Sequence, residues 1–121
     1  MRLLVTGGRD FTDRPFAFKI LDKIHTRRPI TLLIEGGAAG ADRFGREWAR
    51  ARGVPFRTCE ANWERYGNHA GRVRNCQMLR EEKPQFVAAF RGRDGTRHMC
   101  RIAREAGVPV FESWSHGSGD D

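Results

Sequence analysis

Cysteine is scarce in this chain, and long apolar runs are absent. The three cysteines, Cys59, Cys76 and Cys100, share no CxxC spacing, which argues against a disulfide framework or a zinc site and predicts reduced, mostly buried thiols. We expect no metal, and we expect no resident cofactor. No apolar run approaches the roughly 20 residues that cross a bilayer, and Arg9 and Asp10 interrupt the apolar start too early for a signal peptide. A cytoplasmic protein without a membrane segment is therefore expected.

Lysine is equally scarce, because Lys19, Lys23 and Lys83 are the only lysines among 22 basic residues. Against 15 acidic residues, the arginines give a formal net charge of +7. Such a charge can mark a nucleic-acid-binding surface, or it can reflect arginines spread over solvated helix faces. The arginines are dispersed along the chain rather than bunched, which favours the second interpretation. Binding of single-stranded nucleic acid, which would weaken steeply with salt, is kept as an alternative.

The apolar runs and the glycines predict strands that alternate with helices. A chain of 121 residues is long enough for one compact domain with a real core. Strands are predicted at residues 1–6, 30–34, 54–59, 85–90 and 108–111, and the helices between them are predicted to end at Pro29, Gly53, Pro84 and Gly107. This order predicts an α/β domain with a five-stranded, mainly parallel sheet and helices on both faces. We place the domain at residues 1–114 and a flexible polar tail at residues 115–121.

Local sequence signals indicate where several of these elements begin or end. Thr12 or Asp13 is expected to cap the first helix, with Pro15 in its first turn. Residues 60–68 show no clean period and predict a loop, and loops of this length in α/β domains often carry function. Helical spacing resumes over residues 69–83, and another helix is expected from about Thr96.

Three glycine-bearing turns follow predicted strands, at Gly7–Gly8, at residues 36–40 and at residues 92–95. The middle one lies in the run LLIEGGAAGA, residues 32–41, where a buried strand passes through glycines into a helix. Such a turn can present backbone N–H groups and a positive helix terminus to a phosphate, although a tight turn can also need glycine for steric reasons alone. Three of them at equivalent strand ends favour a binding site, since ligands of open α/β sheets lie there.

Charged residues beside these turns have two interpretations each. Asp42 is expected to cap or occupy the first turn of a helix, and less favourably to accept a ribose hydroxyl, since a carboxylate would repel a phosphate. Arg9 and Asp10 either pair with each other, or Arg9 meets an anionic ligand while Asp10 orients it.

The predicted helix at residues 69–83 carries two stripes. Ala70, Val73, Cys76 and Leu79 form a core-like stripe, whereas Gly71, Arg74, Asn75 and Met78 form a mixed one. Either the mixed stripe is solvated, or Arg74 contacts a phosphate and Asn75 a base or sugar edge. Function is favoured, because a glycine in an exposed helix costs about 1 kcal/mol.

The loop at residues 60–68 contributes two aromatic side chains. Trp63 and Tyr66 could each stack on a base or pack the loop onto the sheet, and packing is slightly favoured for either one alone. His69 and His98 are isolated in the sequence, and we interpret both as hydrogen-bonded or solvent-facing rather than as ligands.

Five motifs together resemble the SLOG superfamily, and within it the single-domain group related to YspA and YpsA. They are GGRDF at 7–11, EGGAAGAD at 35–42, NWERYG at 62–67, AGRVRNCQM at 70–78 and RGRDGTRHM at 91–99. The resemblance runs from Met1 to about Trp114 and implies a Rossmann-like three-layer fold that binds nucleotides or their derivatives. Relatives in the superfamily include the LOG phosphoribohydrolases, which cleave an N-glycosidic bond, and the DprA-type proteins, which bind single-stranded DNA.

The LOG enzymes carry a PGGxGTxxE turn whose glycines hold phosphate and whose glutamate is catalytic. Gly92, Gly95 and Thr96 match that pattern, but Arg91, Arg93 and Met99 replace its proline, its second glycine and its glutamate. The resemblance therefore implies that the phosphate cradle is kept and the catalytic acid is lost. Asp10 or Glu35 would be the candidates to replace that acid.

We expect the chain to bind a nucleotide or nucleotide-derived small molecule as a sensor or ligand-binding domain, with N-glycosidic hydrolysis as the alternative. The resemblance also implies a homodimer or a higher homo-oligomer. The glycines of the three turns and Thr96 would offer backbone N–H groups to phosphate. The predicted binding residues are Gly7, Gly8, Arg9, Asp10, Gly36, Gly37, Gly40, Asp42, Trp63, Gly71, Arg74, Asn75, Gly92, Gly95 and Thr96.

Overall fold

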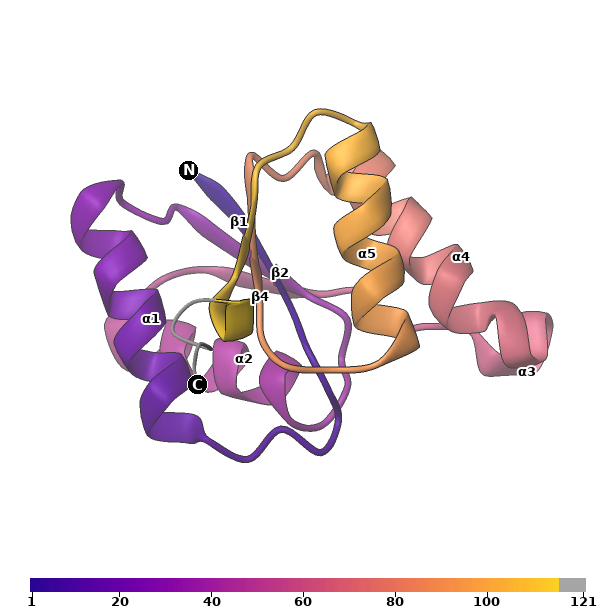
Figure 1. Ribbon diagram of the computed structural model, residues 1–121, viewed down its shortest axis with the longest axis horizontal. Coiled ribbons are helices and arrows are strands. Elements are labelled where there is room, and N and C mark those ends of the chain that lie inside the picture. Colours follow the sequence, from indigo (N-terminus) through magenta and orange to yellow (C-terminus); the bar gives the residue numbers. More distant parts are fainter. Residues whose placement is uncertain (116–121) are drawn as a thin grey trace.

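The computed structural model describes residues 1–115, which form one α/β unit around a five-stranded sheet (Figure 1). In chain order the elements are β1 (Arg2–Thr6), α1 (Arg14–Arg27), β2 (Leu32–Glu35), α2 (Ala41–Arg52), β3 (Phe56–Thr58), α3 (Trp63–Tyr66), η1 (Gly67–His69), α4 (Ala70–Gln77), η2 (Met78–Glu82), β4 (Phe86–Ala89), α5 (Asp94–Glu105), β5 (Val110–Glu112) and η3 (Ser113–Ser115). The predicted tail lies outside the described residues, except for Ser115, which ends η3. No helix within residues 1–115 combines the length and the apolar character needed to cross a membrane.

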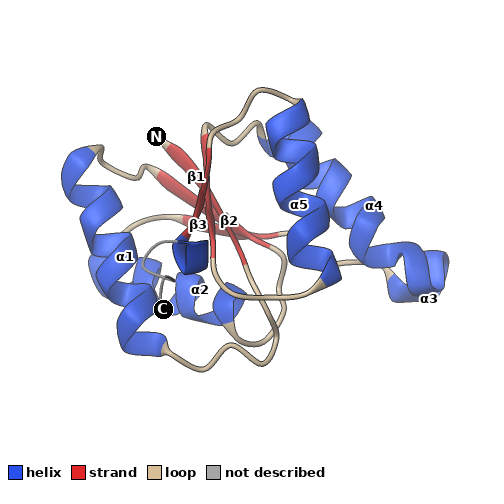
Figure 2. Ribbon diagram, in the orientation of Figure 1, coloured by secondary structure: helices blue, strands red, loops and turns tan. Residues whose placement is uncertain are grey.

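The strands lie in the order β3-β2-β1-β4-β5, and every pairing is parallel. This confirms the predicted five-stranded sheet, which is parallel throughout. Helices α1 and α2 lie on one side of the sheet, and α4 and α5 lie on the other (Figure 2). From β1 the chain first builds outward through β2 and β3, and then returns to place β4 on the opposite side of β1. The strand order thus reverses between β1 and β4, the position at which open α/β sheets bind ligands.

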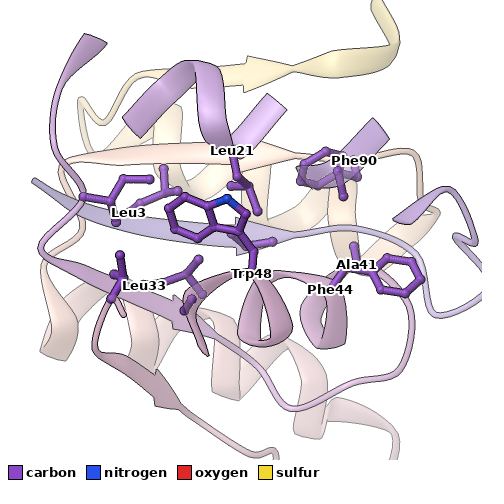
Figure 3. Packing of buried hydrophobic residues seen from close by; sticks show 13 residues of the cluster. Leu3, Leu21, Leu33, Ala41, Phe44, Trp48 and Phe90 are labelled. Carbon is purple, nitrogen blue, oxygen red and sulfur yellow. The ribbon is translucent and has the colours of Figure 1, made fainter. Parts of the chain in front are cut away.

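Two apolar clusters cover the two faces of the sheet, because successive strand residues point in opposite directions. Leu3 and Leu33 pack with Trp48 in the cluster under α1 and α2, which Figure 3 shows. Their neighbours Leu4 and Ile34 belong to the other cluster, under α5 and η2. Burial of these side chains supplies the main stabilising free energy of the fold.

Most of the predicted helix boundaries are confirmed by the backbone. Asp13 caps α1, since its carboxylate accepts the N–H of Phe16 at 3.1 Å, and Pro15 lies in the first turn. Gly53 ends α2 in the left-handed conformation, with φ of 68°. Gly107, with φ of 80°, follows the end of α5.

Three predictions on the second half of the chain need correction. The predicted loop contains the single turn α3, which Asn62 caps by accepting the N–H of Arg65 at 3.0 Å, and one turn is too short to show a period. The predicted helix at 69–83 is α-helical only from Ala70 to Gln77 and continues as the π-helical segment η2 to Glu82. Lys83 has φ of 49° and lies outside the helix, since the residue before a proline disfavours the α conformation. Helix α5 begins at Asp94, two residues before the expected start.

The thiols are less buried than predicted. Cys100 is buried, Cys59 is half-buried and Cys76 is exposed. The stripe that contains Cys76 therefore faces the core only in part, since Ala70 is buried but Cys76 is exposed, and Asn75 and Met78, from the mixed stripe, are buried as well.

Candidate functional site

A cavity of about 480 Å³ lies at the carboxyl ends of the central strands, where the strand order reverses. Its volume is in the range of small-molecule sites. The first loop, the second glycine turn, α3, α4 and the start of α5 all contribute to its wall, which is lined by Thr6, Gly7, Gly8, Arg9, Asp10, Ala38, Asp42, Trp63, Gly71, Arg74, Asn75, Arg93, Gly95 and Thr96.

The structure brings most of the predicted binding residues to this cavity. Gly36 and Gly37 line a smaller adjoining cavity of about 90 Å³, whereas Gly40 and Gly92 line neither of the two. Thr6, Ala38 and Arg93 also line the larger cavity, although they were not among the predicted binding residues. Thr6 ends β1 and Arg93 precedes α5, so strand and helix ends were the signal that could have identified them.

Gly40 and Gly92, which do not line the cavity, allow the three glycine turns to lie close together. Gly40 has φ of 72°, and a side chain on it would collide with the carbonyl oxygen of Gly8. A side chain on Gly92 would collide with Thr96 and would lie 2.8 Å from the nitrogen of Gly8. The steric interpretation therefore holds for Gly40 and Gly92.

The N–H groups of three predicted phosphate-binding glycines are already used inside the chain. Gly8 donates to the carbonyl of Arg91 at 2.9 Å. Gly36 donates to Asp42 Oδ2 at 3.1 Å, and Gly37 donates to Glu35 Oε1 at 2.6 Å. The expectation that these three N–H groups are free for a phosphate is wrong, because they hold the turns in place.

The first turn of α5 differs, because its N–H groups stay available. Within residues 1–115, the N–H groups of Gly95 and Thr96 have no hydrogen-bond acceptor, and the N-cap residue Arg93 makes no capping bond with its side chain. Both residues line the cavity. A helix start of this kind attracts anions through its N–H groups and its dipole.

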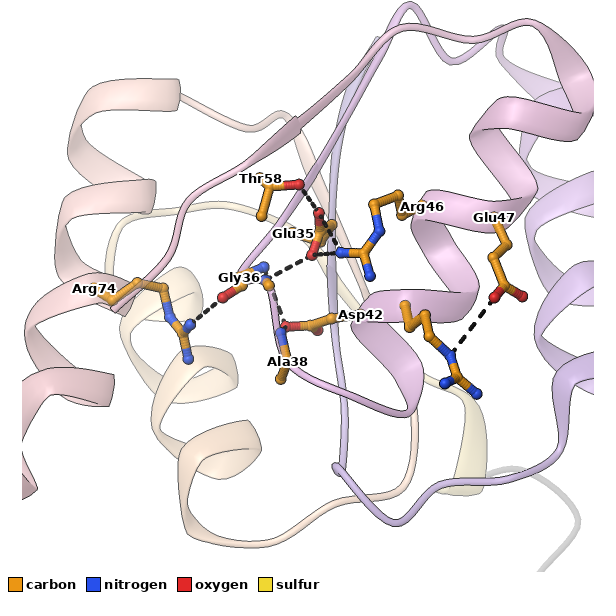
Figure 4. Close-up of polar contacts among 10 residues, drawn as sticks. Glu35, Gly36, Ala38, Asp42, Arg46, Glu47, Thr58 and Arg74 are labelled. Carbon is orange, nitrogen blue, oxygen red and sulfur yellow. Dashed lines mark hydrogen bonds and ion pairs between the residues drawn. The ribbon is translucent and has the colours of Figure 1, made fainter. Parts of the chain in front are cut away.

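Glu35 is a structural anchor and does not line the cavity. Its side chain is completely buried, and both carboxylate oxygens lie 3.3 Å from Arg46 Nη1 (Figure 4). It also accepts hydrogen bonds from the Thr58 hydroxyl and the Gly37 N–H. These contacts tie β2 to β3, to α2 and to the glycine turn, so the structure gives Glu35 no access to a ligand in the cavity.

Asp42 lies in the first turn of α2, which confirms one of the two expected helix positions, and it does not cap that helix, which excludes the other. The N-cap position belongs to Gly40, and Asp42 turns back so that Oδ2 accepts the N–H groups of Gly36 and Ala38, at 3.1 and 3.2 Å (Figure 4). The side chain is buried and lines the cavity. Burial and the nearby Glu35 raise the pKa of Asp42 to about 7, against the opposing effect of its two N–H donors and of Arg74.

Arg74 and Asn75 join the second glycine turn to α5. Arg74 Nη1 donates to the carbonyl of Gly36 at 2.6 Å, and its Nε donates to Asn75 Oδ1 at 3.1 Å. Asn75 Nδ2 in turn donates to the carbonyl of Gly95 at 3.2 Å and lies 3.1 Å from His98 Nδ1. His98 is thus buried and hydrogen-bonded, as one of its two interpretations held, and burial lowers its pKa.

The outer rim of the cavity carries an aromatic ring and charges. Trp63 is 50% exposed, and the guanidinium carbon of Arg9 lies 5.4 Å from the centre of its ring. Asp10 pairs with Arg93 at 3.4 Å rather than with Arg9, and both partners are mostly exposed. Tyr66 does not line the cavity.

The all-parallel sheet, with a cavity lined by several charged and polar side chains where the strand order reverses, defines a Rossmann-like α/β protein. The chain belongs to the YspA, cpYpsA-related SLOG family, whose model matches residues 1–66. It is also 38% identical over 117 residues to the Gene 61 protein of Mycobacterium phage D29, an alignment that covers 91% of this chain and 94% of the phage protein. Membership of the SLOG family suggests a role in binding or processing a nucleotide-related ligand.

Proposed function

We propose that the cavity binds a nucleotide, with a phosphate group at the first turn of α5. The observation that carries this proposal is the pair of unused N–H groups of Gly95 and Thr96, two residues that line a cavity of about 480 Å³ where the strand order reverses. Arg93 adds positive charge at the same helix start, and Arg74 retains donors beyond the two that it uses. These groups suit a phosphate better than a neutral ligand.

A base stacked on Trp63 completes this binding mode. The ring lines the cavity from the rim, is half exposed and has a guanidinium beside it. Aromatic stacking of a base is worth about 1–3 kcal/mol and tolerates different bases. In this proposal Trp63 and Arg9 hold the base, while α5 holds the phosphate.

Gly95→Asp is expected to weaken binding of 5′-nucleotides by about tenfold or more, an effect of about 1.4 kcal/mol. No atom lies within 4 Å of a Cβ built on Gly95, so the new carboxylate fits and places negative charge where the phosphate would bind. Isothermal titration calorimetry with the four ribonucleoside 5′-monophosphates measures the effect. Gly95→Ala is the matched control and should bind like the wild type. Equal affinities for the Asp and Ala variants, or no binding of any nucleotide by the wild type, would overturn the proposal.

Trp63→Ala is expected to weaken nucleotide binding about tenfold, through loss of stacking worth roughly 1–3 kcal/mol. Binding of inorganic pyrophosphate should stay unchanged, because Trp63 does not contact the phosphate in this mode. Tyr66→Ala, on the same helix but away from the cavity, is the control and should keep wild-type affinity for both ligands. A loss of pyrophosphate binding in Trp63→Ala would contradict the assigned role of the ring.

A further inference from the structure

Asp42 is the one deeply buried carboxyl group among the side chains that line the cavity within residues 1–115. It is 5% exposed, whereas Asp10 is mostly exposed and pairs with Arg93. The two carboxyl oxygens of Asp42 have different surroundings. Oδ2 accepts two backbone N–H groups, and Oδ1 has no hydrogen-bond partner in the described part of the chain.

This asymmetry determines where a proton would sit. Two N–H donors already point at Oδ2, so a proton on that oxygen would face them, whereas Oδ1 can carry it without conflict. A buried carboxyl oxygen without a partner in the protein is a position that a ligand can satisfy. A protonated Oδ1 would offer a hydrogen-bond donor to an oxygen of that ligand.

We propose that Asp42 binds the nucleotide as a neutral acid, donating the Oδ1 proton to an anionic oxygen of the ligand, so that binding is coupled to proton uptake by the protein. This inference rests on the proposed nucleotide site and specifies its chemistry. It also removes the objection that a carboxylate so close to the glycine turn would repel a phosphate.

The charges around Asp42 are consistent with a neutral form. Glu35 from β2 disfavours ionisation, Arg74 from α4 favours it, and burial outweighs the remaining effects, which gives a pKa of about 7. The first loop contributes Arg9 and Asp10 to the same cavity, and the start of α5 contributes Arg93. His98, which faces Asn75 from α5, has a pKa below its ordinary value, so it does not take up the proton in the range above pH 7.

The coupling predicts how affinity depends on pH. Above pH 7 the free protein ionises at Asp42, and binding then requires one proton from solution. Affinity should therefore fall by up to about tenfold per pH unit above that point. Ligands with a constant charge are needed, so we choose the 5′-monophosphate methyl esters of the four ribonucleosides as probes.

Isothermal titration calorimetry of the wild type between pH 6 and 9, in two buffers with different ionisation enthalpies, tests the coupling. We expect affinity to fall about tenfold or more between pH 7 and 9, with proton uptake that approaches one proton per ligand above pH 7. Asp42→Asn should bind equally well at every pH, because its amide oxygen can accept both N–H groups while its NH₂ group donates into the cavity. Glu47→Gln, which changes a carboxylate on the same helix that does not line the cavity, should keep the wild-type affinity and pH profile.

The outcomes separate this inference from the proposal on which it rests. Binding by the wild type without pH dependence or proton uptake would overturn the role of Asp42 and leave the nucleotide site intact. A pH profile that persists in Asp42→Asn would do the same. If that variant fails to fold, the proton uptake measured in the wild type decides the question. Failure of all four probes to bind at any pH would instead overturn the nucleotide site itself.

Discussion

Glu35→Ala is expected to lower the free energy of unfolding by about 3–5 kcal/mol, the usual effect of breaking a buried ion pair. The carboxylate is completely buried and is held by Arg46, by the Thr58 hydroxyl and by the Gly37 N–H. Alanine removes the shared acceptor and leaves three donors without a partner on the same side of the sheet. The cost arises mainly from these uncompensated groups, because a well-satisfied buried pair adds little net stability by itself.

Urea unfolding followed by far-ultraviolet circular dichroism measures this difference. Glu47→Ala is a matched control on α2, since Glu47 also pairs with arginines, Arg14 at 2.8 Å and Arg43 at 3.6 Å, but is 33% exposed. Exposed pairs of this kind contribute about 0–1 kcal/mol. Destabilisation of Glu35→Ala no larger than that of Glu47→Ala would show that Glu35 does not anchor the glycine turn.

Much of this fold follows from patterns that are local in the sequence. Most strands are short, largely apolar runs next to a glycine or a proline, and the long helices carry caps or breakers that one sequence reveals, such as Asp13 and Gly53. The single turn α3 could not be recognised in this way, because its cap, Asn62, is not followed by a periodic apolar stretch. Because parallel strands place their carboxyl ends at one edge, the three glycine turns were also expected to meet, and they do.

The use of each polar group in the site could not be predicted in the same way. Whether an N–H group is free depends on a distant acceptor, as for Gly8, which donates to Arg91 on another turn. Asp42 looked like a helix cap because it lies in the first turn of α2, yet its side chain reaches back to the preceding glycines. Glu35 was a candidate to replace the missing catalytic acid, but its side chain pairs with Arg46 and does not line the cavity. The partner of each polar group depends on side-chain contacts between different elements, and residue spacing alone does not predict those contacts.

Asp42 also predicts an unusual dependence of stability on pH. Its pKa rises from 3.8 to about 7 on folding, so between these values the native state holds a proton that the unfolded state has released. Stability therefore falls as pH rises through this window, and the contribution of Asp42 is fully present only below about pH 4. The difference between these two pKa values corresponds to roughly 4 kcal/mol of unfolding free energy. Asp22, whose pKa is lowered chiefly by its hydrogen bond to Arg52, acts in the opposite direction and at lower pH.

Asp42→Asn is expected to remove this loss, because the amide accepts the same two N–H groups without a charge to bury. Between pH 5 and 8 the unfolding free energy of the wild type should fall by a few kcal/mol relative to that of the variant. At pH 8 the variant should be the more stable protein. Urea unfolding midpoints of both proteins, measured without ligand at intervals of half a pH unit, give the difference in stability as a function of pH. Asp10→Asn serves as the control and should run parallel to the wild type. Parallel curves for Asp42→Asn and the wild type would mean that Asp42 is ionised in the native protein throughout this range, and the neutral-acid role would then have no basis.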